Sequence, residues 1–221
     1  MRYDYARKDY YFRIDEKQNT LDSLQKTRVF LDNIDEDEFY WKWVMLALHN
    51  ALYGSMILAL LGSNPARVRD ERKTKKHGEP GKNFVISFWD AFKRIQQPKY
   101  MKMYVGSKFV CINPEGEKYK QNLEYKNKAG FFPPGLISSI EHLNNYIRNQ
   151  FLHYYPTLIS FGKGGFIEII LDTTSLIRFL LLECGNVRID SEDERKFIDD
   201  SLSSIERSTR KMDEKYKNQD V

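Results

Sequence analysis

The sequence predicts an all-α fold, a helical bundle, from two observations. Apolar side chains recur at helical spacing over most of the chain, and no convincing pair of strands is recognisable. The chain has 221 residues, of which 41% are hydrophobic, and its 14 Phe, 14 Tyr and 3 Trp are ample for one buried core. Because we find neither an internal repeat nor an interdomain linker, we expect a single domain over residues 1–221.

The N-terminal part predicts three helices. A loose apolar stripe runs over Thr20–Ile34 after an Asn-Thr start signal. Asp35 is expected to cap a second helix that carries acidic residues in its first turn, and Phe39–Leu61 is apolar on nearly every side. Such a helix is central in the fold or shared with a second chain, and Gly62 should end it. Asn83 is expected to cap a third helix, whose stripe consists of Phe84, Phe88, Phe92 and Ile95.

The C-terminal part predicts three more helices. Pro133 and Pro134 open the first, which should end before Pro156 and has a stripe formed by Leu136, Ile140, Leu143, Ile147 and Phe151. Phe166–Leu182 forms a strongly apolar helix. Glu192–Lys217 forms the last helix, and its apolar seam is suited to docking on the bundle or on a second chain. The seam consists of Ile198, Leu202, Ile205, Met212 and Tyr216, with Thr209 as the one polar member.

The remaining segments predict loops, and the first of them is basic. Residues 63–82 lack apolar periodicity and read as a long surface loop, residues 99–110 are ambiguous between helix and extended chain, and residues 113–130 are polar. The net charge of the chain is only +4. Between Gly62 and Lys82 there are seven basic residues against three acidic ones, so this segment alone accounts for the net charge.

Composition also bears on compartment and cofactors. The two cysteines, Cys111 and Cys184, have no spacing that suits a zinc site, which favours a reduced, cytoplasmic setting. The N-terminal segment has no apolar stretch of the signal-peptide kind. Two apolar segments carry polar residues that would be costly in a bilayer, so we interpret both as buried helices of a soluble protein. We therefore expect no membrane association, no metal and no cofactor.

One group of residues stands out chemically: Arg148, Asn149 and His153, all near the end of one predicted helix. A simpler interpretation exists for each, because Arg148 can be a salt-bridged surface residue and His153 can favour the negative helix C-terminus. On an ideal helix the five-residue step from Arg148 to His153 corresponds to about 140°. Convergence of the two therefore needs the reach of the arginine, a helix end near His153, or a second chain. For His49 and Asn50 we expect hydrogen bonding within the core or across an interface.

The segment 143–156, LNNYIRNQFLHYYP, resembles the signature of the HEPN superfamily, in which an arginine, a polar residue, three variable residues and a histidine follow one another. The segment KWVMLALHNALYGSMILALLG is similar to the central helix of bacterial HEPN proteins of the toxin and abortive-infection type. The order of helices and loops agrees from residue 35 to residue 182. Tyr155 also matches a tyrosine that some members carry two residues after the histidine, although the neighbouring Tyr154 makes this match less diagnostic.

The resemblance implies an up-and-down bundle of four to five core helices, here about residues 35–184, with extra terminal helices such as 192–217. It implies a homodimer in which two motifs face one cleft, and metal-independent endoribonuclease activity of toxin or phage-defence type. In that chemistry His153 moves the protons, Arg148 stabilises the phosphate charge and Asn149 orients one of them. The further partners that it implies are RNA, an antitoxin, and a nucleotidyltransferase that modifies the tyrosine at Tyr155.

Two other interpretations stay open at this point. The chain is either a catalytically silent HEPN module that binds RNA, nucleotide or a protein, or a structural bundle in which Arg148 and His153 are incidental. If RNA is the partner, the basic loop should flank the cleft and supply non-specific phosphate affinity through Lys73, Lys75 and Lys76.

Overall fold

The computed structural model describes residues 14–62, 64–71, 73, 84–97, 99–102, 134–153 and 160–218, together with the backbone of residues 111–112 and 118–119. The described elements confirm an all-α fold. They are α1 (Glu16–Asp32), α2 (Tyr40–Leu61), η2 (Pro65–Val68), α4 (Phe88–Ile95), β1 (Cys111–Ile112), β2 (Lys118–Tyr119), α5 (Pro134–Glu141), η5 (His142–Ile147), α6 (Arg148–Leu152), α7 (Lys163–Arg178), η6 (Phe179–Glu183) and α8 (Glu192–Lys217).

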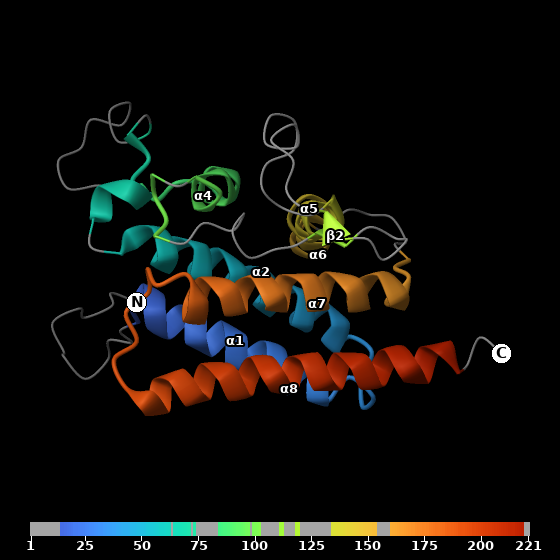
Figure 1. Ribbon diagram of the computed structural model, residues 1–221. Helices are drawn as coiled ribbons and strands as arrows, with labels where there is room; N and C mark the ends of the chain where they lie inside the picture. Colours follow the sequence, from blue (N-terminus) through green and yellow to red (C-terminus); the bar gives the residue numbers. More distant parts are fainter. Residues whose placement is uncertain are drawn as a thin grey trace, which may run out of the picture.

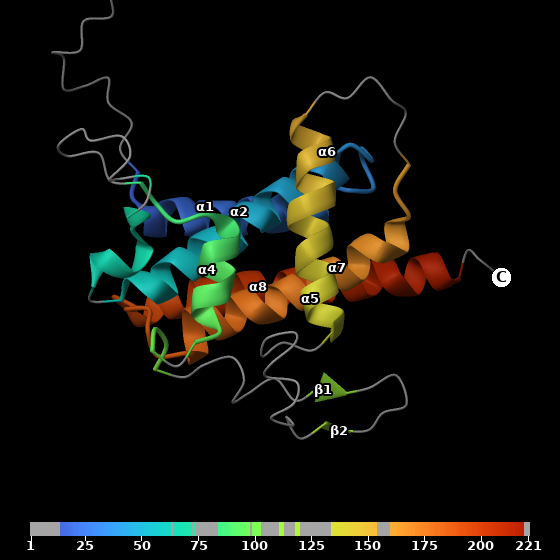
Figure 2. The same ribbon diagram turned by 90° about the horizontal axis from the view of Figure 1, so that it is seen from above.

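The helices form a set of long, roughly aligned helices with shorter ones laid across it. Helices α1, α2, α7 and α8 run side by side, and α4 and the α5–α6 helix lie over α2 (Figure 1). Seen from above, α4 and α5–α6 cross the long helices instead of running along them (Figure 2). One continuous apolar core joins all these elements, and it includes Leu24 of α1 and Leu202 of α8. The terminal helices are thus part of the same core as residues 35–184.

Helix α1 begins earlier than its apolar stripe suggests. The side chain of Asp15 accepts a hydrogen bond from the amide of Gln18, whose own side chain accepts one from the amide of Asp15. This reciprocal cap starts the helix at Glu16. Farther along α1, Thr20 lies directly against Gly54 of α2, where a methyl group on the glycine would come within 2.1 Å of the threonine Oγ1. The two helices can approach this closely because position 54 has no side chain.

The start of α2 differs from the expectation, while its apolar character and its end are confirmed. The predicted cap at Asp35 is wrong, because residues 33–39 form successive turns. Within them the carboxylate of Asp37 accepts a hydrogen bond from the amide of Phe39. The helix begins at Tyr40 without a side-chain cap and ends at Gly62, which has a φ of 44°. Among the described residues, α2 alone has the length and composition of a membrane span, and 67% of its most apolar window is buried in the fold. Core helices of soluble proteins share that property.

Helix α4 is shorter than predicted. It begins at Phe88, and its cap is Ser87 instead of Asn83. The reason is that the backbone before Phe88 forms hydrogen bonds with another segment. The amide of Asp70 donates to the carbonyl of Phe84, and the amide of Ile86 donates to the carbonyl of Val68. The described part of the basic segment is therefore no free loop. It contains the short helix η2 and pairs with the chain that leads into α4.

The predicted helix that starts at Pro134 is confirmed, and it changes pitch along its length. Its stripe is buried as predicted, except that Phe151 is only partly buried. Within η5 the hydrogen bonds span five residues, so the amide of Arg148 donates to the carbonyl of Leu143. The helix returns to α geometry in α6 and ends at Leu152, ahead of Pro156 as expected. A helical segment of this π type inserts an extra residue into the turn and often occurs at functional sites.

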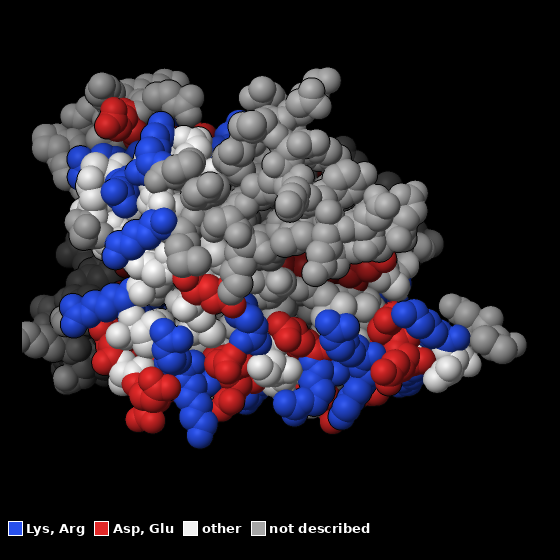
Figure 3. Space-filling model, in the orientation of Figure 1, with Lys and Arg blue, Asp and Glu red and all other residues white. Residues whose placement is uncertain are grey.

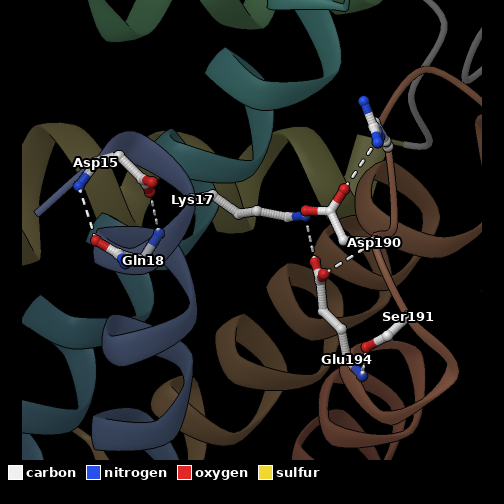
Figure 4. A network of polar contacts seen from close by, with 7 residues as sticks. Asp15, Lys17, Gln18, Asp190, Ser191 and Glu194 are labelled. Carbon is white, nitrogen blue, oxygen red and sulfur yellow. Dashed lines mark hydrogen bonds and ion pairs between the residues drawn. The ribbon is translucent and has the colours of Figure 1, made fainter.

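Helices α7 and α8 form an antiparallel pair that covers α1 and α2. Thr209, the polar member of the α8 seam, is fully buried, and its hydroxyl donates to the carbonyl of Ile205. The N-terminal ends of α1 and α8 are joined by Lys17, whose ammonium lies 2.7 Å from Asp190 and 2.6 Å from Glu194 (Figure 4). Burial by itself lowers the pKa of Lys17. The hydrogen bonds and negative charges of these two carboxylates together raise it by more, so the net shift is upward.

One element was not expected from the sequence. Cys111–Ile112 and Lys118–Tyr119 form a two-stranded antiparallel pair, in which Cys111 faces Tyr119. The prediction that no strand pair exists is wrong here, since two residues a strand are too few to leave an alternating pattern in the sequence. Cys184 is a buried free thiol.

Candidate functional site

Arg148, the arginine of the motif, lines a surface groove of about 760 Å³. Helix α1 contributes Asp22 and Lys26 to its wall, and α2 contributes His49 and Asn50. Arg148 is partly buried at the start of α6, where the helix has just returned from π to α geometry. Its Nη1 donates to the side-chain oxygen of Asn149 at 2.9 Å. The motif's arginine and its polar neighbour are therefore in direct contact.

A chain of hydrogen-bonded amides runs beside this groove. The Nε2 of His49 bonds the side-chain oxygen of Asn144 at 2.9 Å, and the amide nitrogen of Asn144 donates to Asn145 at 2.9 Å. The indole of Trp89 donates to the same oxygen of Asn145 at 3.0 Å. The amide nitrogen of Asn149 donates to the backbone carbonyl of Asn145, also at 2.9 Å. This network ties α2 and α4 to the motif helix.

The π segment positions this network. Asn144 and Asn145 both lie in η5, and the apolar residues on either side of them, Leu143 and Ile147, are buried in the core. With Leu143 and Ile147 fixed inside, the wide turn places both asparagines where they reach α2 and α4. The expectation that His49 bonds a neighbouring helix is thus confirmed. Its partner was not identified from the sequence, although two adjacent asparagines in an amphipathic helix were a signal for it.

The imidazole of His49 is shifted toward its neutral form. Burial is the main cause of the lowered pKa of His49, and the nearby positive charge of Arg148 lowers it further. The hydrogen bond that His49 donates to the side-chain oxygen of Asn144 opposes these effects and raises the pKa. The ring also stacks on Phe88, with centroids 4.9 Å apart. A neutral histidine held this way serves as a fixed hydrogen-bonding group and not as a cation at neutral pH.

His153 is not part of the groove that Arg148 lines. It is the first residue after α6, it is exposed, and its backbone amide still donates to the carbonyl of Asn149. The groove is lined by Arg148 and Leu152 but not by His153. Within one chain the two motif residues therefore diverge, in keeping with the five-residue helical step between them.

The other expected site residues are placed only in part. Lys73 is exposed, its backbone amide donates to Asp70, and it is not among the residues that line the groove. Tyr155, Lys75 and Lys76 lie outside the described residues, as does His77. His142 is exposed, as expected.

The rim of the groove is apolar, which the sequence did not indicate. Trp43 and Leu152 line the groove with 47% and 44% of their surface exposed. Phe39, one helical turn before Trp43, is 71% exposed. In a chain with an otherwise well-buried core, large apolar side chains grouped beside a polar groove are typical of an interaction surface.

Comparisons with known proteins found no matching family model, no similar curated protein and no similar solved structure. Among the described residues, no group of three or more His, Cys, Asp or Glu side chains is arranged to hold a metal ion.

Proposed function

We propose that this protein is a cytoplasmic, metal-independent endoribonuclease of the HEPN type, used in toxin or phage-defence biology. The observation that supports it is the state of Arg148, a partly buried guanidinium that is held by its motif neighbour Asn149 and lines a 760 Å³ groove. The motif histidine His153 lies five residues farther on, exposed and at the helix end. Both have the exposure that a substrate-binding role requires.

The proposed reaction is an internal transfer at phosphorus. The imidazole of His153 removes the proton from an RNA 2′-hydroxyl, whose oxygen attacks the adjacent phosphorus while the bond to the 5′-oxygen breaks. A proton returned to that leaving oxygen gives a 5′-hydroxyl end and a 2′,3′-cyclic phosphate end. The guanidinium of Arg148 donates to the phosphate oxygens and stabilises the charge that develops on them.

A homodimer supplies the convergence that one chain lacks. Because His153 follows the end of α6 and does not line the groove with Arg148, a second copy would bring its own histidine toward the groove of the first. The exposed Trp43 and Leu152 at the rim are suited to such a contact, and Leu152 immediately precedes His153. Sedimentation should show a dimer at micromolar concentration, and an active monomer would contradict the shared cleft.

The test is cleavage of RNA by purified protein with EDTA present. His153→Ala and Arg148→Ala should each lower turnover on the order of a hundredfold or more, without loss of thermal stability. His142→Ala is the matched control for His153→Ala, since His142 is an exposed histidine of the same helical stretch. Arg188→Ala is the control for Arg148→Ala, because the side chain of Arg188 is 91% exposed. Both control variants should retain wild-type turnover.

Two results would overturn this proposal. Wild-type turnover in both well-folded motif variants would remove the ribonuclease assignment. Activity that is abolished by chelation and restored by magnesium, with 3′-hydroxyl products, would indicate metal-assisted water attack instead. Partial recovery of activity on mixing the Arg148→Ala and His153→Ala proteins would support a cleft that is built from two chains.

The second candidate function is a catalytically silent HEPN module that binds RNA, nucleotide or a protein partner. The observation that favours it is the exclusion of His153 from the lining of the groove. On that assignment, RNA binds without being cleaved. In either case neutralising Lys73, Lys75 and Lys76 together should weaken RNA binding and flatten its salt dependence. An antitoxin, or a nucleotidyltransferase acting on Tyr155, is the further partner we propose for the toxin assignment.

A further inference from the structure

A second cavity, of about 540 Å³, lies between η2, α4 and the chain that follows α4. Four cationic side chains from two separate segments line it: Arg67, Arg69, Arg94 and Lys99. Arg94 and Lys99 come from a different stretch of the chain, outside the basic segment between Gly62 and Lys82. The fold brings them to the described part of the basic segment.

Contacts with an aromatic ring and with backbone carbonyls hold three of these cations in place. The guanidinium of Arg94 lies 5.5 Å from the ring centroid of Tyr100 and donates to the carbonyl of Arg67. Arg67 in turn donates to the carbonyl of Tyr100 at 3.2 Å, and the ammonium of Lys99 lies 4.8 Å from the same ring. Neither a carbonyl nor a π face neutralises a full positive charge.

Three carboxylates also line the cavity. Asp70 accepts a hydrogen bond from the backbone amide of Lys73, and Asp90 accepts one from the hydroxyl of Ser87. Glu71 is the third acidic residue of the lining and is exposed. Among the described residues, none of the four cations of the cavity forms an ion pair with a carboxylate.

The surface around the cavity is also positive. The described residues between 64 and 102 carry seven basic side chains and three acidic ones, whereas α8 carries seven basic and eight acidic. Figure 3 shows Lys and Arg gathered at the upper left, over the region beside α4, while both signs alternate along α8 below. An anion near this face would be attracted to the cavity and not to α8.

The cavity borders the motif groove. Ile86 lines the cavity and Phe88, two residues later, lines the groove. The hydroxyl of Tyr53, which also lines the groove, donates to the carbonyl of Ile86. The segment 86–88 thus contributes one residue to each site, which places the cavity and the groove on either side of the chain that leads into α4.

We infer that the cavity between η2 and α4 binds the phosphodiester backbone of single-stranded RNA next to the bond that lies in the motif groove. This inference rests on the proposed function for its ligand, but not on cleavage. Arg69 and Lys99 are the side chains to vary, because Arg67 and Arg94 also hold backbone carbonyls and their loss would disturb the fold.

The experiment is fluorescence anisotropy with a labelled 2′-O-methyl oligouridylate of about 12 nucleotides, a length within the usual range of a single-strand site. This probe cannot react by 2′-hydroxyl attack, so the wild-type protein can be used. The cavity variant is Arg69→Gln with Lys99→Gln. Its matched control is Arg210→Gln with Lys211→Gln, which removes the same charge from two exposed positions of α8.

The cavity variant should bind the probe several-fold more weakly than wild type in moderate salt. Its slope of log affinity against log salt should be smaller by about 1.4, because each lost contact to a single-strand phosphate changes the slope by about 0.7. The control should lose less than half as much affinity. Thermal unfolding of both variants verifies that the fold is intact.

Equal effects in the two variants, or no binding of the probe by wild type, would overturn the inference. So would binding of inorganic phosphate that the cavity variant loses and that leaves wild-type RNA binding unchanged, because this would indicate a site for small anions that RNA does not use. The proposed function fails in a different way, since cleavage of ordinary RNA would be absent while the probe still binds at the cavity.

Discussion

Gly54→Ala should destabilise the protein through the contact between α1 and α2. The new methyl group would lie 2.1 Å from Oγ1 of Thr20, 3.0 Å from its Cβ and 3.2 Å from its Cγ2. Such overpacking costs up to about 3 kcal/mol when backbones must separate, and the better helix propensity of alanine returns about 1 kcal/mol. We therefore expect a net loss of about 2 kcal/mol, or a decrease in Tm of about 4–8 °C.

Thermal unfolding by circular dichroism measures this effect, with Gly164→Ala as the control because no atom lies within 4 Å of a methyl group there. That control should keep or raise the Tm. Adding Thr20→Ala to Gly54→Ala removes Oγ1 and Cγ2 and should recover at least about 1 kcal/mol relative to the sum of the single effects. A Gly54→Ala protein as stable as wild type, or a double variant with no such recovery, would refute the close approach of the two helices.

The other predictions concern two pKa shifts and one ion-pair network. Burial raises the pKa of Asp172, so the folded protein binds a proton at this carboxyl more tightly than the unfolded chain does. The free energy of unfolding should therefore fall as pH rises from about 4 through the raised pKa. Asp172→Asn should flatten that part of a series of Tm values measured against pH. The lowered pKa of His49 has the opposite sign, so stability should fall as pH drops below about 6.5, and in His49→Gln this acid-side loss should shrink. Arg178 of α7 contacts Asp199, Ser203 and Glu206 of α8, so Arg178→Ala should cost about 1 kcal/mol by denaturant titration, whereas the highly exposed Arg188→Ala should cost nothing measurable.

The apolar pattern of the sequence predicted the helices well where the pattern is dense. The helix Glu192–Lys217 has the bounds that its apolar seam indicated, and Gly62 ends α2 as a helix-ending glycine should. These features are local, because a cap or a stripe involves residues within a few turns of one another. Starts that depend on other segments were missed, as at Phe88, where pairing with Val68 and Asp70 holds the preceding residues extended.

The candidate site divides in the same way. The sequence by itself identified Arg148, Asn149 and His153 and the divergence of the arginine and the histidine, since these follow from spacing on one helix. Only the tertiary structure decided that the arginine lines a groove beside His49, and that Arg94 joins Arg67 at a second cavity. Residues 27 positions or more apart carry no mutual spacing signal, because their meeting depends on how α2, α4 and the motif helix cross. The physical reason is that packing of the buried faces sets those crossings, and packing involves the whole core at once.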